Sequence, residues 1–418
     1  MRPLLLAGLA TAVALQAQPK VQRFTLPNGL RVVHLEDHER PLVRARLHVN
    51  LEPADTPSGR QGLPQLVMRM LSHSDTADLK ADVFDRMLED SGIQFTHSLE
   101  QDGMTWQFVA RSRDQDRAMG LLVDRLARTV FDPSILEIQR LACWRDEERL
   151  ESSPHLRLRQ LLVQDPSSRP TLAGLGAITL EDLLTFQARV LRPDRAVLIL
   201  HGDLGLEQAK RLVLLSLGSW TTRSLPSGVP ASAGAKSPSS LSHLEVPKIP
   251  VTGTSLRIQA AAVRPDDLPE EVSALLGLLI PGEAALSPVR VAMDRDSLVA
   301  ILDAEAGTAG AAAGSLLYER LAGLRLRGFT QSDLDRARVA WLARRSLETL
   351  HSEAQMDSAL AEARGHGVSE ERVKAVSLAV LNAGLKRWLD PARIRSGAVG
   401  DPEVLKALPL PRHRPIAP

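Results

Sequence analysis

The feature of the sequence that most constrains the fold is an internal repeat. Residue types in the first half recur in the second half at one constant offset of 198 residues, without a gap. The matching pairs are Phe131 and Phe329, Ser134 and Ser332, Leu136 and Leu334, Arg140 and Arg338, Leu180 and Leu378, Leu183 and Leu381, Leu191 and Leu389, Pro193 and Pro391, Arg195 and Arg393, and Gly202-Asp203 and Gly400-Asp401. Leu pairs alone are weak evidence, but shared Phe, Pro and Gly-Asp are hard to obtain by chance. The repeat predicts two copies of one α+β unit, and the alternative is two unrelated helical domains.

Composition agrees with a two-domain globular chain. The chain has 418 residues, more than one ordinary domain needs, and 44% of them are hydrophobic. Only 3% are aromatic, so the core must be mostly aliphatic. The net charge of +1 gives no electrostatic reason to expect nucleic-acid binding. Cys143 is the only cysteine, which excludes an intrachain disulfide, and its helical spacing with Ile138 and Leu150 predicts a core residue.

Segments at the termini and in the middle set the predicted boundaries. Residues 1–17 combine Arg2, an apolar run from Leu4 to Leu15 and small residues up to Ala17, which is typical of a signal peptide. The alternative is a short membrane anchor, but a run of about 12 apolar residues is shorter than the roughly 20 that span a bilayer. The predicted parts are a signal peptide (1–17), a first domain (20–220), a linker rich in Ser, Pro and Gly (221–250), a second domain (251–408) and a Pro-rich tail (409–418).

Local patterns predict the order of helices and strands. Pro27-Asn28-Gly29 between two apolar-rich runs predicts a β-hairpin. Further strands are predicted at 43–51, 93–99, 104–110 and 196–200, and helices at 78–90, 113–130, 134–150, 180–190 and from Gly205 onward. In the second half, the predicted elements are a strand at 255–262, several helices from Glu270 to Leu389, and a final strand at 394–399.

One further stretch, residues 62–71, bears on which chemistry the chain could perform. It reads Gly62-Leu63-Pro64-Gln65-Leu66-Val67-Met68-Arg69-Met70-Leu71 and predicts a helix that follows a turn. Gln65 and Arg69 are four residues apart and therefore share one helix face, with Met68 beside them. This stretch is similar to the zinc-binding helix of the insulinase-like (pitrilysin) metallopeptidases, in which two His bind zinc and a Glu activates water.

The resemblance extends over nearly the whole chain beyond residue 20. It includes Leu26-Pro27-Asn28-Gly29-Leu30-Arg31-Val32-Val33, the segment Ile178-Thr179-Leu180-Glu181-Asp182, and Gly202-Asp203 at a strand end. It implies a duplicated insulinase/LuxS-like metallopeptidase fold of class α+β, in which two α/β sandwich halves are joined by a linker. Each half would hold an antiparallel-rich sheet with helices on one face.

The residues in the family's catalytic positions lack the family's chemistry. The slots of the two His and the Glu hold Gln65, Arg69 and Met68, and the slot of the third zinc ligand holds Asp146. A single Asp cannot hold zinc without further protein ligands. Arg69 keeps its positive charge because its pKa exceeds roughly 12, and Met68 cannot accept a proton. We expect a salt bridge between Arg69 and Asp146 in place of the metal; the alternative is that both face solvent separately.

Two other places bear on catalysis. The resemblance implies that the Arg and Tyr with which active relatives hold substrate are replaced here by Met293 and Ala300, and Arg290 or Arg295 could partly substitute. His34-Leu35-Glu36-Asp37-His38 mimics a zinc motif, but it lies at a strand end, where residues four apart do not converge. We therefore interpret it as a strand end and surface turn.

The resulting expectation is an exported protein without catalytic residues, metal or cofactor. By resemblance it would be the non-catalytic subunit that pairs with a zinc-bearing homologue, forms a heterodimer, and helps to enclose and bind peptides. It would be periplasmic or secreted, with no membrane span once the signal is removed and no nucleic-acid partner. Two alternatives stay open, an active zinc metalloendopeptidase with unrecognised ligands, and a stand-alone binding or scaffold protein of the cell envelope.

Overall fold

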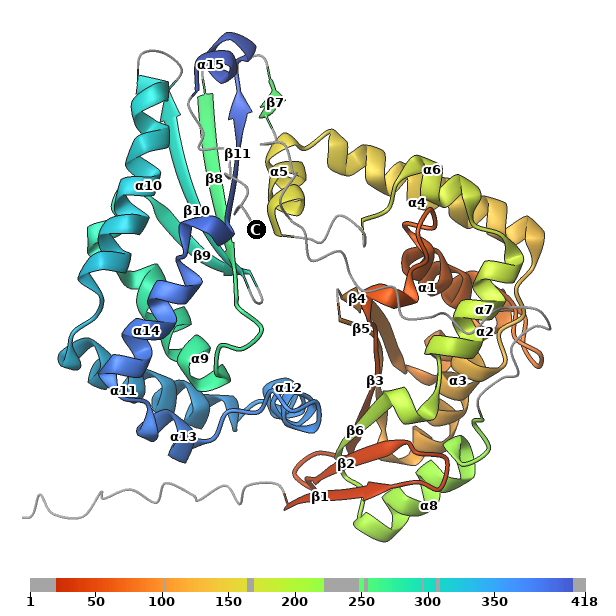
Figure 1. Ribbon diagram of the computed structural model, residues 1–418. Coiled ribbons are helices and arrows are strands. Elements are labelled where there is room, and N and C mark those ends of the chain that lie inside the picture. The colour runs from red at the N-terminus through yellow and green to blue at the C-terminus, as the bar shows by residue number, and fades with distance from the viewer. Residues whose placement is uncertain are drawn as a thin grey trace, which may run out of the picture.

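The computed structural model describes residues 20–100, 102–163, 169–221, 248–251, 255–294, 297–305 and 309–408. They form two mixed sheets, one from each half of the chain, with helices packed on both (Figure 1). The predicted signal peptide and Pro-rich tail lie outside the described residues, as does most of the predicted linker. Within the described part, no helix is long and apolar enough to cross a membrane.

The first sheet has six strands in the order β1-β2-β6-β3-β5-β4. Its strands are β1 (Lys20–Thr25), β2 (Arg31–Glu36), β3 (Leu42–Asn50), β4 (Gln94–Glu100), β5 (Gly103–Arg111) and β6 (Ala196–Gly202). Only β2 and β6 pair in parallel. The predicted hairpin joins β1 to β2: Gly29 supplies a φ of 91°, and the Asn28 side chain donates to the backbone oxygens of Leu217 and Trp220. Asn28 thus fixes the turn and anchors it to the helix layer.

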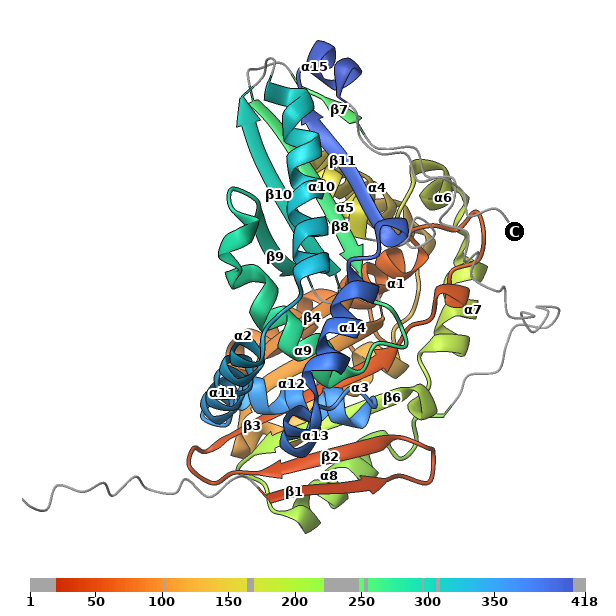
Figure 2. The ribbon, with the colours of Figure 1, turned by 60° about the vertical axis from the view of Figure 1, so that its left-hand side comes forward.

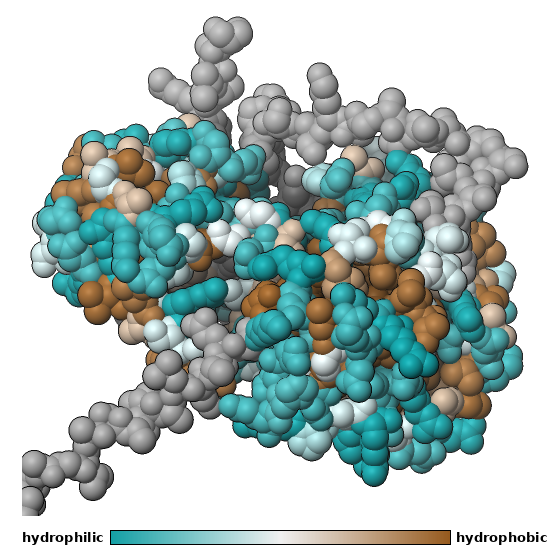
Figure 3. Space-filling view, turned by 90° about the horizontal axis from the view of Figure 1, so that it is seen from below, coloured by the Kyte–Doolittle hydropathy of each residue, from teal (hydrophilic) through white to brown (hydrophobic). Residues whose placement is uncertain are grey.

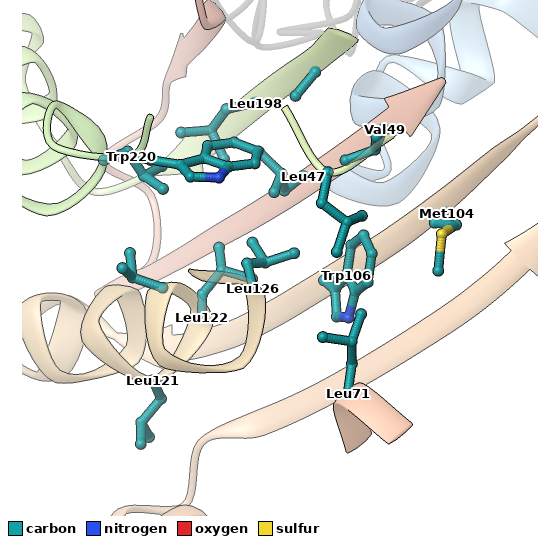
Figure 4. Close-up of a cluster of buried hydrophobic side chains, with 14 of the residues drawn as sticks. Leu47, Val49, Leu71, Met104, Trp106, Leu121, Leu122, Leu126, Leu198 and Trp220 are labelled. Carbon is teal, nitrogen blue, oxygen red and sulfur yellow. The ribbon is translucent and has the colours of Figure 1, made fainter. Parts of the chain in front are cut away.

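Helices of the first half cover one face of this sheet and bury its core. They are α1 (Leu63–His73), α2 (Ala81–Ser91), α3 (Gln115–Ala127), α4 (Pro133–Glu151), α6 (Leu172–Ala177), α7 (Leu180–Val190) and α8 (Leu206–Leu217). The core is aliphatic with a few large aromatic side chains, as composition predicted. Trp106 of β5 lies between Leu47 of β3 and Leu71 of α1 (Figure 4). The sheet and α1 are therefore packed through one continuous cluster.

The second sheet has five strands in the order β7-β11-β8-β10-β9. Its strands are β7 (Lys248–Pro250), β8 (Ser255–Val263), β9 (Arg290–Asp294), β10 (Ser297–Glu305) and β11 (Ile394–Gly400). Its helices are α9 (Glu270–Leu279), α10 (Ala309–Arg327), α11 (Gln331–Glu348), α13 (Glu370–Ala375), α14 (Leu378–Trp388) and α15 (Pro402–Ala407). The helix α12 (Ser352–Ala363) also comes from this half but packs elsewhere.

Two sequence predictions about the second half were wrong. The stretch predicted as helical contains the strand pair β9 and β10, because a short apolar run such as 298–302 fits a strand or a helix equally well. The predicted linker ran to residue 250, but β7 already pairs in parallel with β11 and so belongs to the second sheet. Strand β7 is three residues long, too short for its apolar pattern to be recognised.

The repeat relates the structures of the two halves element by element. Helices α6 and α13, helices α7 and α14, and strands β6 and β11 have identical bounds after the shift of 198 residues. The repeated arginines make the same contact: Arg140 donates to the backbone oxygen of Ile178 over 2.8 Å, and Arg338 to that of Val376 over 2.5 Å. The prediction of a duplicated α+β fold is therefore confirmed.

A pair of repeat-related helices is exchanged between the halves. Helix α5 (Pro154–Val163) belongs to the first half but packs on β8 and β11, whereas α12 packs on β6 and β2 of the first sheet (Figures 1 and 2). Apolar contacts hold both, with Leu158 and Leu162 against the second sheet and Met356 against the first. Helices on one face only were expected; instead the second face of each sheet also carries a helix, because its apolar strip must be covered.

Charged groups reinforce the contact of α12 with the first sheet. Arg46 of β3 is only 9% exposed, donates to Glu353 over 2.7 Å, and forms an ion pair with Asp357. His201 of β6 hydrogen-bonds to the Gln355 side chain over 2.8 Å. A buried guanidinium needs such partners, because an unpaired buried charge is strongly destabilising.

The underside of the molecule mixes polar and apolar side chains (Figure 3). Helix α8, the lowest helix in Figure 1, exposes Leu214 and Leu215. Scattered apolar side chains of this kind are ordinary on a protein surface.

Candidate functional site

The helix in question, α1, starts at a turn that requires glycine. Gly62 has a φ of 100°, in the left-handed region, and a Cβ there would lie 2.6 Å from a methyl carbon of Leu175. Pro64 follows in the first turn, where its missing N–H costs nothing. One face of α1 is buried against the core, and it includes Leu66, Val67, Met70 and Leu71.

The structure brings together two of the four residues predicted at the degenerate centre. Arg69 on α1 donates from Nη2 to Oδ2 of Asp146 on α4, so the predicted salt bridge is present. The side chains are 29% and 46% exposed, respectively. Because such a pair is partly solvated, its contribution to stability is small, about 0–1 kcal/mol. The bridge matters more for metal binding, because Asp146 is the only carboxylate among the four predicted residues and Arg69 already binds it.

Met68 and Gln65 occupy different surroundings on the same helix. Met68 is only 4% exposed and belongs to the hydrophobic core, so it packs rather than faces a reacting group. Gln65 is half-buried near the start of α1. Neither side chain offers an ionisable group, so no residue of α1 at these positions can act as a general base.

The donor set does not fit zinc. Zinc in proteins is held by three or four Cys, His or carboxylate ligands. Here the Asp146 carboxylate already binds a guanidinium, and Arg69 places a permanent positive charge beside it. Across the described ranges, no three His, Cys, Asp or Glu side chains are grouped so that they could share a metal ion. We therefore derive no step through a metal at this place.

Two histidines beside the bridge were not anticipated from the sequence. His73 follows Arg69 by one helical turn, and His97 of β4 lies 3.2 Å from the Ser72 hydroxyl through Nε2. Burial and the Arg69 charge both lower the pKa of each imidazole. The spacing of four residues could have identified His73; His97 is brought here only by the packing of β4 against α1. A lowered pKa favours the neutral imidazole, which is the form that binds metals, but within the described residues neither histidine belongs to a group of three possible metal ligands.

Cys143 is buried next to the same bridge, as expected for a core residue. Burial raises the pKa of its thiol to about 11, and the nearby Asp146 carboxylate acts in the same direction. A thiol with such a pKa is protonated at neutral pH and is neither a nucleophile nor a metal ligand.

In the second half, the two positions that would hold substrate by resemblance, Met293 and Ala300, pack on the core side of the sheet. Ala300 of β10 is fully buried in the core, and Met293 of β9 packs against that core. Arg290 is on the opposite face, where it pairs with Asp303, which also bonds to Arg257 over 3.2 Å. Arg295 lies outside the described residues. Met293 and Ala300 therefore serve packing in this chain.

The His34 to His38 segment does not form a ligand pair. His34 is within β2, is fully buried, and contacts the backbone oxygen of Leu204 through Nε2. His38 is beyond the strand end and lies between Asp203 and Glu36, at 2.7 and 3.1 Å. These two carboxylates raise the pKa of His38. The strand end and surface turn expected here are present.

Comparison with protein families identifies the fold. The profile of the insulinase family (peptidase family M16) matches residues 31–173, and that of the peptidase M16 inactive domain matches residues 177–283. The chain belongs to the insulinase (M16) family. The matched inactive domain begins after α1 and Asp146, so its name by itself says nothing about the Arg69 centre. No curated protein matches the sequence.

Solved structures of the same fold are distant in sequence. A protease from Helicobacter pylori has a TM-score of 0.71 and 15% identity, over 92% of this chain and 100% of that chain. A peptidase M16 inactive domain from Pseudomonas fluorescens has a TM-score of 0.71 and 15% identity, over 91% and 98%. The periplasmic protease PqqL from Escherichia coli has a TM-score of 0.70 and 14% identity, over 96% of this chain but 48% of that chain. At these identities the likeness establishes the fold alone.

Proposed function

We propose that this chain is a catalytically inactive member of the insulinase family that binds peptides together with a zinc-bearing homologue. The observation that carries the proposal is the ion pair between Arg69 and Asp146. It occupies the place where active relatives, by resemblance, hold their metal. The scaffold around it is intact, with α1 and α4 packed against each other and into the core. A binding subunit must keep the fold, but it does not need the catalytic residues.

The proposed partner is a second unit of the same fold. One relative, PqqL, is about twice as long as this chain and is matched over half of its length. That chain is therefore long enough to hold a second unit of similar size. We infer that here the second unit is a separate polypeptide, which carries the zinc motif and completes an enclosure for peptides.

The proposed location is outside the cytoplasm. The predicted signal peptide at 1–17 supports export, and one relative of the same fold is named as periplasmic. A periplasmic or secreted protein would meet unfolded peptides that need to be bound or degraded.

The test compares the chain alone with the chain co-expressed with a homologue that has the full H-x-x-E-H motif. We expect the purified chain to contain no stoichiometric zinc by elemental analysis and to leave unfolded peptides intact. We expect the pair to co-purify and to cleave peptides in a chelator-sensitive way. Stoichiometric zinc with chelator-sensitive cleavage by the chain alone would establish the active-peptidase alternative. Failure to co-purify with such homologues would favour the stand-alone binding protein.

A further inference from the structure

Helix α12 leaves the second half and lies against β2 and β6 of the first sheet (Figures 1 and 2). Met356 and Ala359 pack there on an apolar strip of the sheet. Beside this strip, carboxylates of the helix bind arginines of the sheet, as Glu353 binds Arg46 over 2.7 Å. We call this contact between α12 and strands β2, β3 and β6 the α12 seam. Together with the contact of α5, it joins the two halves.

A buried histidine lies within the α12 seam. His201 of β6 points toward α12, because it alternates along the strand with Val197 and Ile199, which pack against that helix. Its side chain is only 1% exposed, and its Nε2 lies 2.8 Å from Oε1 of Gln355 on α12. The helix therefore covers this imidazole and hydrogen-bonds to it.

The hydrogen bonds of Gln355 assign the tautomer of His201. The amide nitrogen of Gln355 donates to the backbone oxygen of Thr349, so that its Oε1 faces the imidazole as an acceptor. Nε2 of His201 therefore carries the proton, and Nδ1 is left without one. Nδ1 is buried and has no hydrogen-bond partner among the residues that the structure describes. A second proton would create a buried N–H without an acceptor, which is unfavourable.

Charged groups face His201 from each element that packs on it. Burial has the largest effect and lowers the pKa of His201 from its ordinary value of 6.5. Two carboxylates act in the opposite direction: Asp37, in the turn after β2, lies 3.7 Å from Nε2, and Glu353 lies on α12. Arg44, opposite His201 on β3, disfavours the charged imidazole, as does His34 of β2 when it is protonated.

We propose that the α12 seam is an acid-sensitive contact, which opens when His201 takes up a second proton. In the closed seam this proton goes to Nδ1, which has no acceptor, whereas in the open seam water solvates both ring nitrogens. The open form therefore binds the proton more readily. By linkage, a closed seam whose histidine has a lowered pKa is stable above pH 6.5 and is weakened as the pH falls below it. The inference goes beyond the proposed function and does not depend on it.

The other buried histidines of the first sheet do not explain such an opening. His48 lies on the same face of β3 as Arg46, but its pKa is about 4, so it stays neutral above pH 5. His34 alternates with Val33 and Leu35, which pack against α12, and therefore lies on the other face of the sheet. A change between pH 7.5 and 5 at the α12 seam thus points to His201.

The test measures amide hydrogen exchange of the full chain by mass spectrometry between pH 7.5 and 5, with exchange times scaled for the pH dependence of the intrinsic chemistry. The readout is the protection of α12, with α9 in the core of the second half as the internal reference. We expect α12 to lose protection about tenfold over this range while α9 keeps it. A group whose pKa is near 6.5 in the open form allows at most a roughly thirtyfold change at pH 5.

Two variants and a control identify the group. His201→Gln can donate to Gln355 at every pH and should abolish the loss of protection. Gln355→Glu places a carboxylate beside Nε2, where it pairs with the charged imidazole, so the trend should reverse and α12 should be better protected at pH 5 than at pH 7.5. The control is His351→Gln, at an exposed histidine directly before α12, which should behave like the unmodified protein. Circular dichroism shows whether each variant is folded at pH 7.5.

Four results would overturn the inference. The first is a helix α12 that stays fully protected at pH 5 in the unmodified protein, and the second is a simultaneous loss at α9, which indicates global unfolding. The third is an equal loss in folded His201→Gln, or an unreversed trend in Gln355→Glu, which also decides the matter if His201→Gln does not fold. The fourth is abolition of the loss by His351→Gln, which would make that residue the sensing group.

Discussion

At the scale of single residues, residue type, charge and burial explain why positions 65, 68 and 69 of α1 offer neither a general base nor an anionic metal ligand. Three substitutions suffice for this: a thioether is buried in the core at Met68, an amide stands at Gln65, and a guanidinium binds Asp146 at Arg69. The residue types could be read from the sequence, and the bridge was expected because the resemblance places Asp146 in the slot of the third zinc ligand, opposite Arg69. The packing of Met293 against the core and the burial of Ala300 could not be read from the sequence, because they depend on the register of β9 against β10.

His48 makes stability depend on pH. It is 2% exposed, bonds to the Thr105 hydroxyl through Nδ1, and burial lowers its pKa to about 4. The unfolded chain takes up a proton at this residue near pH 6.5, whereas the folded chain stays neutral until about pH 4. Stability is therefore lost as pH falls through this window, by about 3 kcal/mol from this residue alone.

We expect the variant His48→Gln to unfold with a shallower pH dependence between pH 6.5 and 4. Urea titrations at several pH values measure the slope. The matched control is His351→Gln, the same substitution at an exposed position. A slope unchanged by His48→Gln would show that the acid sensitivity arises at other groups.

At the scale of elements, the repeat preserves contacts as well as helices. Arg140 ties α4 to the carbonyl end of α6, and Arg338 ties α11 to the end of α13 in the same way. Both arginines satisfy backbone oxygens that would otherwise lack a donor at a helix end. This explains why an arginine is retained at the repeated position although most of the surrounding surface residues differ.

We expect Arg140→Ala and Arg338→Ala each to lower the free energy of unfolding by about 1.5–3 kcal/mol, since each removes charge-assisted bonds to buried carbonyls. Arg145→Ala is the control, because Arg145 lies on the exposed face of α4. Chemical denaturation gives the values. Equal effects at Arg140 and Arg145 would contradict the argument.

At the scale of the whole molecule, the exchange of α5 and α12 joins the halves into one folding unit. Each helix covers an apolar strip on the sheet of the other half. Neither half can bury its own sheet on both faces. The halves should therefore unfold together, although each contains a complete core on the helix side.

We expect Glu353→Gln/Asp357→Asn to destabilise this exchange by about 1–2 kcal/mol. Arg46 is then left buried without an anionic partner, but it keeps its bond to Gln107, and both carboxylates are more than half exposed. Calorimetry should show a lower midpoint and, if α12 detaches first, two transitions in place of one. The control Glu319→Gln, on the surface of α10, should leave the transition unchanged. An unaltered midpoint in the double variant would show that apolar contacts alone hold α12.

The sequence by itself determined the local structure and the chemistry that is missing. Hairpin turns and helix starts depend on neighbouring residues, the repeat is found by comparing the sequence with itself, and side-chain chemistry is fixed by residue type. Only the tertiary structure decided the exchange of α5 and α12 and the packing of Met293 and Ala300 in the second half. The physical reason is that these depend on contacts between residues hundreds of positions apart, such as Arg46 with Asp357. Such contacts depend on which surfaces the two halves present to each other, and no local pattern encodes this.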